Sequence, residues 1–389
     1  MDKSKNAFFG SILLVTGCCI GAGMLGLPMD ILTLGFVPSL FPLFFAWVYM
    51  NMSGVMLVEL YAGVKEDINL MGLMEKTLGK VFKGITFILF AFLFYSILTA
   101  YINGSSIIIH DFIAKLGLDL PFWFVVIGNT LLLFLGILFG TGEVDVINRV
   151  FVGGMFLTYF TLIALGIFNL NSDNLATMQW SKQVVFSIPL FLVSFGYQNL
   201  IPTLSNYLDR DKRKVILSFV IGTGIALGVY LIWNFITLGL APEGASTTGS
   251  SADFLTRIFA QSPGMILFLI SIFSLFAIVT SLLTISTSFV DFLGDRTQKQ
   301  SNRFFYCVCV LLPPLVFALF NPHIFLTALT YGAGFSAICL FGILPTLALW
   351  KSRYGSKPIQ TEKILPGGKA LLAVYLIVSV SIILFKLFQ

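Results

Sequence analysis

The sequence predicts an all-α membrane protein of about eleven transmembrane helices, and three observations support this fold class. Of the 389 residues, 57% are hydrophobic and only 11% are charged, a composition far from that of water-soluble globular domains. The apolar residues form stretches of about twenty, the length at which a helix crosses the bilayer core. Lys and Arg gather in alternate connections between these stretches, as they do in the loops of inner-membrane proteins.

Eleven apolar stretches make up one transmembrane domain over residues 1–389. The predicted spans are 7–34, 36–63, 84–111, 121–140, 147–169, 183–207, 214–240, 263–293, 303–320, 323–349 and 367–388. The N-terminus begins like a signal peptide, but no small-residue cleavage site follows, so we expect a retained first span. The Gly/Ser/Thr-rich segment 241–264 is expected to be an outer loop with a short helix near 252–260.

The basic residues predict the orientation of the spans. If the N-terminus is cytoplasmic, four of the 23 Lys and Arg residues fall on the outer side, namely Lys115, Lys182, Arg257 and Lys386. Because cytoplasmic loops hold the excess of Lys and Arg, we expect a protein of the bacterial inner membrane with its N-terminus inside and its C-terminus in the periplasm. The basic residues form no continuous stripe, which argues against nucleic acid as a partner.

The first span is poorly suited to an unbroken helix. Gly17, Gly21, Gly23 and Gly26 are followed closely by Pro28, and each Gly costs a helix about 1 kcal/mol relative to Ala. Non-helical backbone at membrane depth is tolerated where it is buried in protein or lines a cavity. Its free N–H and C=O groups can hold a carboxylate and a cation together. Close helix packing by small residues is the alternative, and this span alone does not decide between them.

A second interruption lies in the sixth span, where Gly196, Gln198, Asn199 and Pro202 replace apolar residues. Breaks in spans one and six match two five-helix halves. Because five is odd, the second half enters the membrane from the opposite side and is an inverted repeat of the first. We therefore predict discontinuous helices 1 and 6, with a ligand site between the two breaks at the bilayer midplane. The predicted boundaries are 7–169 for repeat one, 183–349 for repeat two and 367–388 for an extra helix.

A family resemblance lies in two stretches, TGCCIGAGMLGLP and VSFGYQNLIPTLSNYLDRDKRK. Both resemble the aromatic (hydroxy and aromatic) amino acid permease family, the tyrosine and tryptophan permeases of the amino acid-polyamine-cation superfamily. The resemblance covers nearly the whole chain. It implies a leucine-transporter-like fold and a secondary active transporter that imports tyrosine, tryptophan or phenylalanine by alternating access. It also implies cation-coupled symport, which in this family is usually described as proton-driven.

Two departures from the family pattern affect selectivity and coupling. Cys18 and Cys19 replace small or hydroxylated residues of the first motif. Tyr197, Gln198 and Asn199 stand where relatives tend to have Phe-His-Gly. The second departure removes an imidazole, so a proton role of that His does not transfer to this chain.

The resemblance also implies a substrate site between the two breaks. The amino acid carboxylate would lie on backbone amides of residues 21–23, and its amino group on carbonyls of residues 17–20 and 191–194. Phe195 and Tyr197 would face an aromatic side chain. The predicted substrate-binding residues are Ile20, Gly21, Ala22, Gly23, Met24, Tyr101, Asn103, Phe191, Ser194, Phe195, Gly196, Tyr197 and Gln198.

Hydroxyl groups in the eighth span permit a cation site. In sodium-coupled members of the superfamily, a Thr-Ser pair and carbonyls of the first helix hold the cation, which implies a sodium site of Gly17, Ile20, Ala277, Thr280 and Ser281. Oxygen ligands suit such a hard cation. Hydroxyls that bond back to their own helix are the alternative. We expect no cofactor, and the coupling ion stays open between H⁺ and Na⁺.

Ionisable residues within spans mark relays by default, but none is expected at the midplane. We expect Glu59 to snorkel or cap at the cytoplasmic end of its span, Asp30 to follow the first span on the outer side, and His110 and His323 to lie at outer span ends.

An enzyme would need a nucleophile with a base, paired carboxylates or metal ligands in one cavity, and the sequence offers none of these. A channel or scaffold would not explain two paired breaks. The nearest alternative is a serine/threonine permease of the same superfamily, which needs a narrower pocket.

Overall fold

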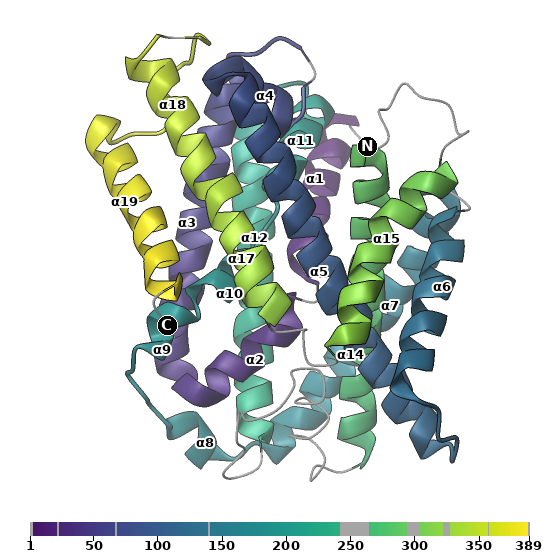
Figure 1. Ribbon diagram of the computed structural model, residues 1–389. Helices are drawn as coiled ribbons and strands as arrows, with labels where there is room; N and C mark the ends of the chain where they lie inside the picture. Colours follow the sequence, from purple (N-terminus) through teal and green to yellow (C-terminus); the bar gives the residue numbers. More distant parts are fainter. Residues whose placement is uncertain are drawn as a thin grey trace.

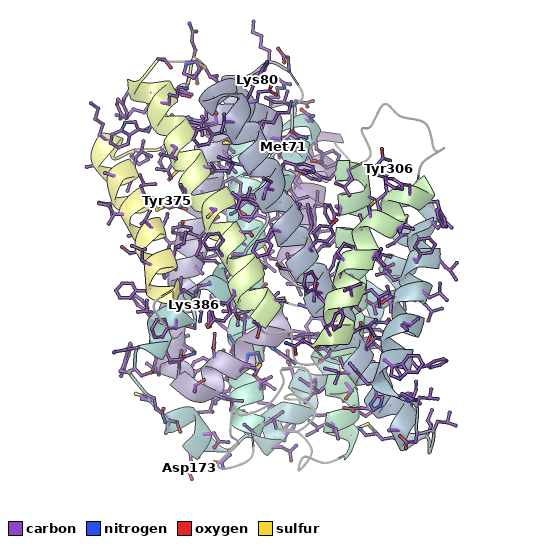
Figure 2. All side chains as sticks on the ribbon, in the orientation of Figure 1. Met71, Lys80, Asp173, Tyr306, Tyr375 and Lys386 are labelled. Atoms are coloured by element: carbon purple, nitrogen blue, oxygen red, sulfur yellow. The ribbon has the colours of Figure 1, made fainter. Side chains whose placement is uncertain are left out.

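The computed structural model describes residues 3–21, 23–66, 68–138, 141–241, 264–293, 303–321, 327–356 and 358–387. In these ranges every regular element is a helix. Most of the long helices run side by side as a bundle, with α4 and the connection between α18 and α19 at one end and α8 at the other (Figure 1). Side chains fill the space between the helices (Figure 2).

The helices follow the apolar stretches of the sequence. In chain order they are α1 Lys3–Cys19, α2 Gly23–Leu34, α3 Phe36–Ala62, α4 Leu70–Leu78, α5 Lys80–Lys115, α6 Phe122–Leu138, α7 Thr141–Gly166, η1 Ile167–Asn169, α8 Ser172–Ala176, α9 Gln183–Phe186, α10 Ile188–Ser194, η2 Gln198–Leu200, α11 Ile201–Tyr207, α12 Lys212–Leu240, α14 Gly264–Leu293, α15 Arg303–Phe320, η5 Ala328–Ala333, α17 Gly334–Ala337, η6 Ile338–Ile343, α18 Leu344–Tyr354 and α19 Gly368–Leu387.

Nine segments in the described part of the chain are long and apolar enough to cross a membrane, and the bent pair of α1 and α2 makes up to ten. The shorter α6 is also apolar. These segments fall on the predicted spans, so the chain is an all-helical, multi-pass membrane protein. The expected helix at 252–260 lies outside the described residues. The inverted repeat of two five-helix halves stays a prediction.

Both Gly-containing segments of the sequence coincide with ends of helices. α1 ends at Cys19 and α2 begins at Gly23, and their axes are bent by 57°. In the sixth span α10 ends at Ser194 and η2 begins at Gln198. Each end leaves backbone groups without partners in their own helix, so other parts of the protein must satisfy them.

Helix α12 lies against α1, α2 and α3. A Cβ atom at Gly222 would lie 2.9 Å from the carbonyl oxygen of Ile12 and from Cβ of Val15, so only Gly permits α12 to approach α1 this closely. Thr16 Oγ1 then donates to the Gly222 carbonyl at 3.1 Å. At its N-terminus, α12 is capped by Asp211, whose pKa is lowered by the backbone N–H groups of Lys214 and Arg213 together with the nearby Lys214 charge.

The last helix is attached to α3 by an aromatic contact. Tyr375 of α19, labelled in Figure 2, stacks on Tyr49 with ring centroids 4.3 Å apart. The Tyr375 hydroxyl donates to the Tyr49 carbonyl at 2.9 Å, and the Tyr49 hydroxyl is bonded to Ser379 Oγ at 2.7 Å. These contacts fix α19 on the outside of α3.

A buried ion pair joins α3 to α18. Arg353 Nε and Nη2 donate to the two carboxylate oxygens of Glu59 at 2.6 and 2.5 Å. The backbone N–H groups of Ile364 and Leu365 also donate to Glu59 Oε2, each at 2.9 Å. The Glu59 side chain is 0% exposed, so the expectation that it snorkels or caps is wrong. Its carboxylate instead holds the connection between α18 and α19 onto α3.

We expect Glu59→Gln to lower the free energy of unfolding by about 3–5 kcal/mol, because it leaves the Arg353 charge buried and unpaired. Thermal unfolding of the detergent-purified protein measures this effect. The matched control is Glu75→Gln, which removes the exposed Glu75–Lys83 pair and should cost less than about 1 kcal/mol. Equal losses in the two variants would contradict the assignment.

Candidate functional site

The ends of α1 and α10 meet at one side chain of α12. The Tyr230 hydroxyl oxygen lies 2.5 Å from the Cys19 carbonyl oxygen and 2.7 Å from the Ser194 carbonyl oxygen. Cys19 and Ser194 are the last residues of their helices, so their carbonyls lack helical partners. All three residues are buried. The ends of α1 and α10 are therefore neighbours in space, although residues 19 and 194 are 175 positions apart in the sequence (194 − 19 = 175).

Further contacts close the space around this meeting point. Trp233, three residues after Tyr230, donates from Nε1 to the Met24 carbonyl at 3.1 Å. Phe195 packs edge-on against the Tyr230 ring with centroids 5.2 Å apart. Cys18 Sγ donates to the Gly196 carbonyl at 3.6 Å. Helix α12 thus contacts both sides of the break in the first span, at the end of α1 and near the start of α2.

Tyr197 and Gln198 extend from the second break toward α3. The Gln198 amide nitrogen and the Tyr197 hydroxyl donate to the same Met50 carbonyl, at 3.1 and 3.3 Å. The Tyr197 ring stacks on Phe219 with centroids 5.1 Å apart. Gln198 Oε1 is buried and accepts no hydrogen bond from the described residues. Gln198 therefore offers a buried acceptor, a group that in proteins is normally satisfied.

Glycine at position 54 makes room for the Tyr197 ring. A Cβ atom at Gly54 would lie 2.2 Å from the Tyr197 hydroxyl oxygen and 3.1 Å from Phe219 Cζ. A side chain at this position of α3 would therefore displace the aromatic pair from its present place.

Helix α14 approaches the first break at the predicted cation site. A Cβ atom at Gly21 would lie 2.5 Å from Ser281 Oγ, so this contact brings one predicted sodium ligand, Ser281, next to a predicted substrate-binding residue of the first break. Thr280 Oγ1, however, donates to the Ala277 carbonyl of its own helix at 3.1 Å, as the alternative interpretation expects. At Gly17 an added Cβ would meet nothing within 4 Å. A cation here would depend on carbonyls and hydroxyls, because the described residues hold no group of three or more His, Cys, Asp or Glu that could bind a metal.

The described residues among the remaining predicted site residues are buried or stand at the start of a helix. Ile20, Met24 and Phe191 are buried. Gly23 is the first residue of α2. Ala22 lies outside the described residues. Tyr101 is also buried, on α5.

Two polar residues and the histidines need separate mention. Asn103 is buried on α5, and its contact with a substrate stays a prediction. Asp30 lies within α2 with 8% of its surface exposed, so the expectation that it follows the first span is wrong. His110, near the end of α5, has Nε2 3.0 Å from the Leu120 carbonyl oxygen. His323 lies outside the described residues.

The sequence analysis missed Tyr230 and Trp233 because they lie in a predominantly apolar stretch of α12. Tyr and Trp are both grouped with the hydrophobic residues when composition is analysed. A buried Tyr or Trp nevertheless usually directs its one polar atom at a hydrogen-bond partner. Their spacing of three residues puts them on one face of a helix. An aromatic pair with polar atoms on one face of a central span was the available signal.

Comparison with known proteins agrees with the family resemblance. The chain matches the model of the tryptophan/tyrosine permease family over residues 4–386. It is 30% identical to the tyrosine-specific transport system 2 of Haemophilus influenzae over 98% of this chain and 96% of that protein. It is 28% identical to the tryptophan-specific transport protein of Shigella flexneri over 97% of this chain and 94% of that protein. These relatives are named as transport proteins and not as enzymes. The chain therefore belongs to the tryptophan/tyrosine permease family and is a permease, not an enzyme.

Proposed function

We propose that this protein is a secondary active transporter that imports tyrosine, tryptophan or phenylalanine across the bacterial inner membrane by cation-coupled symport. The observation that carries the proposal is the meeting of two helix ends at Tyr230, where the Cys19 and Ser194 carbonyls lie within 2.7 Å of one hydroxyl. The names of the relatives support an aromatic amino acid as the substrate.

The two kinds of helix end suit the two charges of an amino acid. The carbonyl ends of α1 and α10 carry partial negative charge and favour an ammonium group, whereas the start of α2 at Gly23 carries partial positive charge and favours a carboxylate. Substrate would lie between the two halves, 7–169 and 183–349. In an inverted repeat these halves can rock about such a site and open it to each side in turn.

Buried aromatic rings beside the breaks favour an aromatic substrate. Phe191, Phe195 and Tyr197 are all 0% exposed, and each ring pair with a substrate would contribute about 0.5–1.5 kcal/mol beyond area burial. A serine/threonine permease is the alternative from the sequence, but its smaller substrates would gain nothing from ring contacts with these residues. The relatives' names also make a channel or scaffold the weaker interpretation.

The coupling ion is H⁺ or Na⁺ in this proposal. The contact of Ser281 with Gly21 supports a sodium site beside the first break. For proton coupling, the Glu59 carboxylate is already occupied by Arg353, which leaves Asp30 in α2 as a carboxyl group nearer the break. The Lys and Arg distribution supports a cytoplasmic N-terminus and a periplasmic C-terminus.

Competition in proteoliposomes tests the substrate class. We expect unlabelled tyrosine, tryptophan or phenylalanine to suppress uptake of labelled tyrosine, and serine, threonine and the other amino acids to leave it largely unchanged. Suppression by serine or threonine at lower concentrations than by any aromatic amino acid would establish the alternative permease.

We expect Gly54→Ala to reduce tyrosine uptake at least about tenfold, because the added methyl displaces the Tyr197 ring and misplacement at a site is costly. Gly228→Ala is the matched control, since a Cβ there meets nothing within 4 Å. Adding Tyr197→Phe removes the oxygen that lies nearest to the new methyl and should restore part of the uptake. Normal uptake by Gly54→Ala would show that the packing of the Tyr197 ring against Gly54 does not affect the substrate site.

The double variant Thr280→Ala, Ser281→Ala tests the coupling ion. If sodium drives uptake, replacement of sodium by choline should abolish uptake in the wild type, and the double variant should lose its dependence on sodium. The sodium site is refuted if wild-type uptake collapses with a protonophore and ignores the removal of sodium.

A further inference from the structure

Tyr230 provides one proton to two backbone acceptors. A phenolic hydroxyl carries a single hydrogen, yet both the Cys19 and the Ser194 carbonyl oxygens lie within hydrogen-bond distance, at 2.5 and 2.7 Å. The Tyr230 hydroxyl therefore donates to only one of these carbonyls at a time. Both carbonyls end helices and carry partial negative charge, and Tyr230 is 0% exposed. One hydroxyl hydrogen for two such acceptors is a deficit on the part of Tyr230, and a group with more donors and a positive charge would suit this buried point better.

A primary ammonium group would correct that deficit, since it has several N–H donors and a full positive charge. It cannot simply join the three oxygens in their present positions. Three acceptors about 2.8 Å from one tetrahedral nitrogen would be more than 4 Å from one another, whereas the hydroxyl oxygen is 2.5 and 2.7 Å from the carbonyl oxygens. The hydroxyl occupies the position in which an ammonium would serve both carbonyls.

We propose that the Tyr230 hydroxyl is a resident cap on the amino-group subsite, which the α-ammonium of the amino acid displaces when it binds. This inference rests on the proposed function, since it takes the ligand to be an amino acid. Tyr230 then competes with the substrate's ammonium group for the Cys19 and Ser194 carbonyls and does not itself bind the substrate. Because Tyr230 and Trp233 lie on the same face of α12 and Trp233 is bonded to Met24, displacement of the hydroxyl also changes how α12 holds the first break.

Competition and direct contact predict opposite effects of Tyr230→Phe. Loss of the competing hydroxyl frees both carbonyls from Tyr230 for the ammonium, so binding of phenylalanine should tighten about three- to tenfold, the range expected for one net hydrogen bond. The analogue 3-phenylpropanoate has the ring and carboxylate but no ammonium, and its affinity should change less than about twofold. Binding to detergent-purified full-length protein is measured with labelled phenylalanine, and 3-phenylpropanoate by competition.

The matched control is Tyr159→Phe. The Tyr159 hydroxyl donates to the Val229 carbonyl at 3.0 Å, so the same change removes a hydroxyl that is bonded to the residue preceding Tyr230. Its effect on the two ligands should be equal. If 3-phenylpropanoate does not compete at any concentration, the test uses phenylalanine alone. Tighter phenylalanine binding by Tyr230→Phe than by Tyr159→Phe then supports the proposal, and equal or weaker binding contradicts it. Tyr230→Met, which lacks the hydroxyl and adapts to irregular space, replaces Tyr230→Phe if thermal unfolding shows that the latter does not fold.

Three results would overturn the proposal. Weaker phenylalanine binding by Tyr230→Phe would mean that the hydroxyl contacts the bound substrate. Equal changes for phenylalanine and 3-phenylpropanoate would remove Tyr230 from the amino-group subsite. Disappearance of the effect in sodium-free buffer would assign the carbonyls to a metal ion. Failure of the proposed function looks different, because the wild-type protein would then bind none of the aromatic amino acids.

Discussion

The need to satisfy backbone polar groups within the membrane is the constraint on which the arrangement of this permease depends. An unsatisfied N–H or C=O group in the bilayer core costs several kcal/mol, and the helix ends at Cys19 and Ser194 expose such groups. Side chains of helix α12 donate hydrogen bonds to these backbone groups. Tyr230 serves the ends of α1 and α10, and Trp233 serves Met24 in α2. Gly222 permits the close approach of α12 to α1 that accompanies these contacts.

The Glu59–Arg353 pair meets the same need, because buried charged groups must also have partners within the protein. A buried carboxylate is tolerated because a guanidinium and two backbone N–H groups surround it. The backbone donors come from the connection before α19, so neutralising the carboxylate also orders that connection. The pair and its two backbone donors therefore hold three parts of the fold together, namely α3, α18 and the connection before α19.

The sequence alone predicted the fold class and the positions of most spans, because apolar length is a strong signal in membrane proteins. The Gly- and Pro-containing stretches that it singled out lie at or next to the ends of α1 at Cys19 and α10 at Ser194, since Gly and Pro weaken helices wherever they occur, while discontinuous helices 1 and 6 stay a prediction. It did not predict what meets those ends. The partners of a backbone carbonyl depend on tertiary packing, and Tyr230 looks like any other aromatic residue in an apolar span. Glu59 was misplaced for a related reason, because its partner Arg353 lies 294 residues away.

The use of a tyrosine at the meeting point has a consequence for a transporter. A Lys at this position would donate to both carbonyls permanently and exclude a cationic group, whereas a Phe would donate to neither carbonyl and make the ligand-free protein less stable. A hydroxyl lies between these extremes, because it stabilises the helix ends with one hydrogen bond and remains weaker than an ammonium as a partner. Binding and release both need a modest difference in free energy between occupied and unoccupied forms. A cap with one proton for two acceptors keeps that difference small.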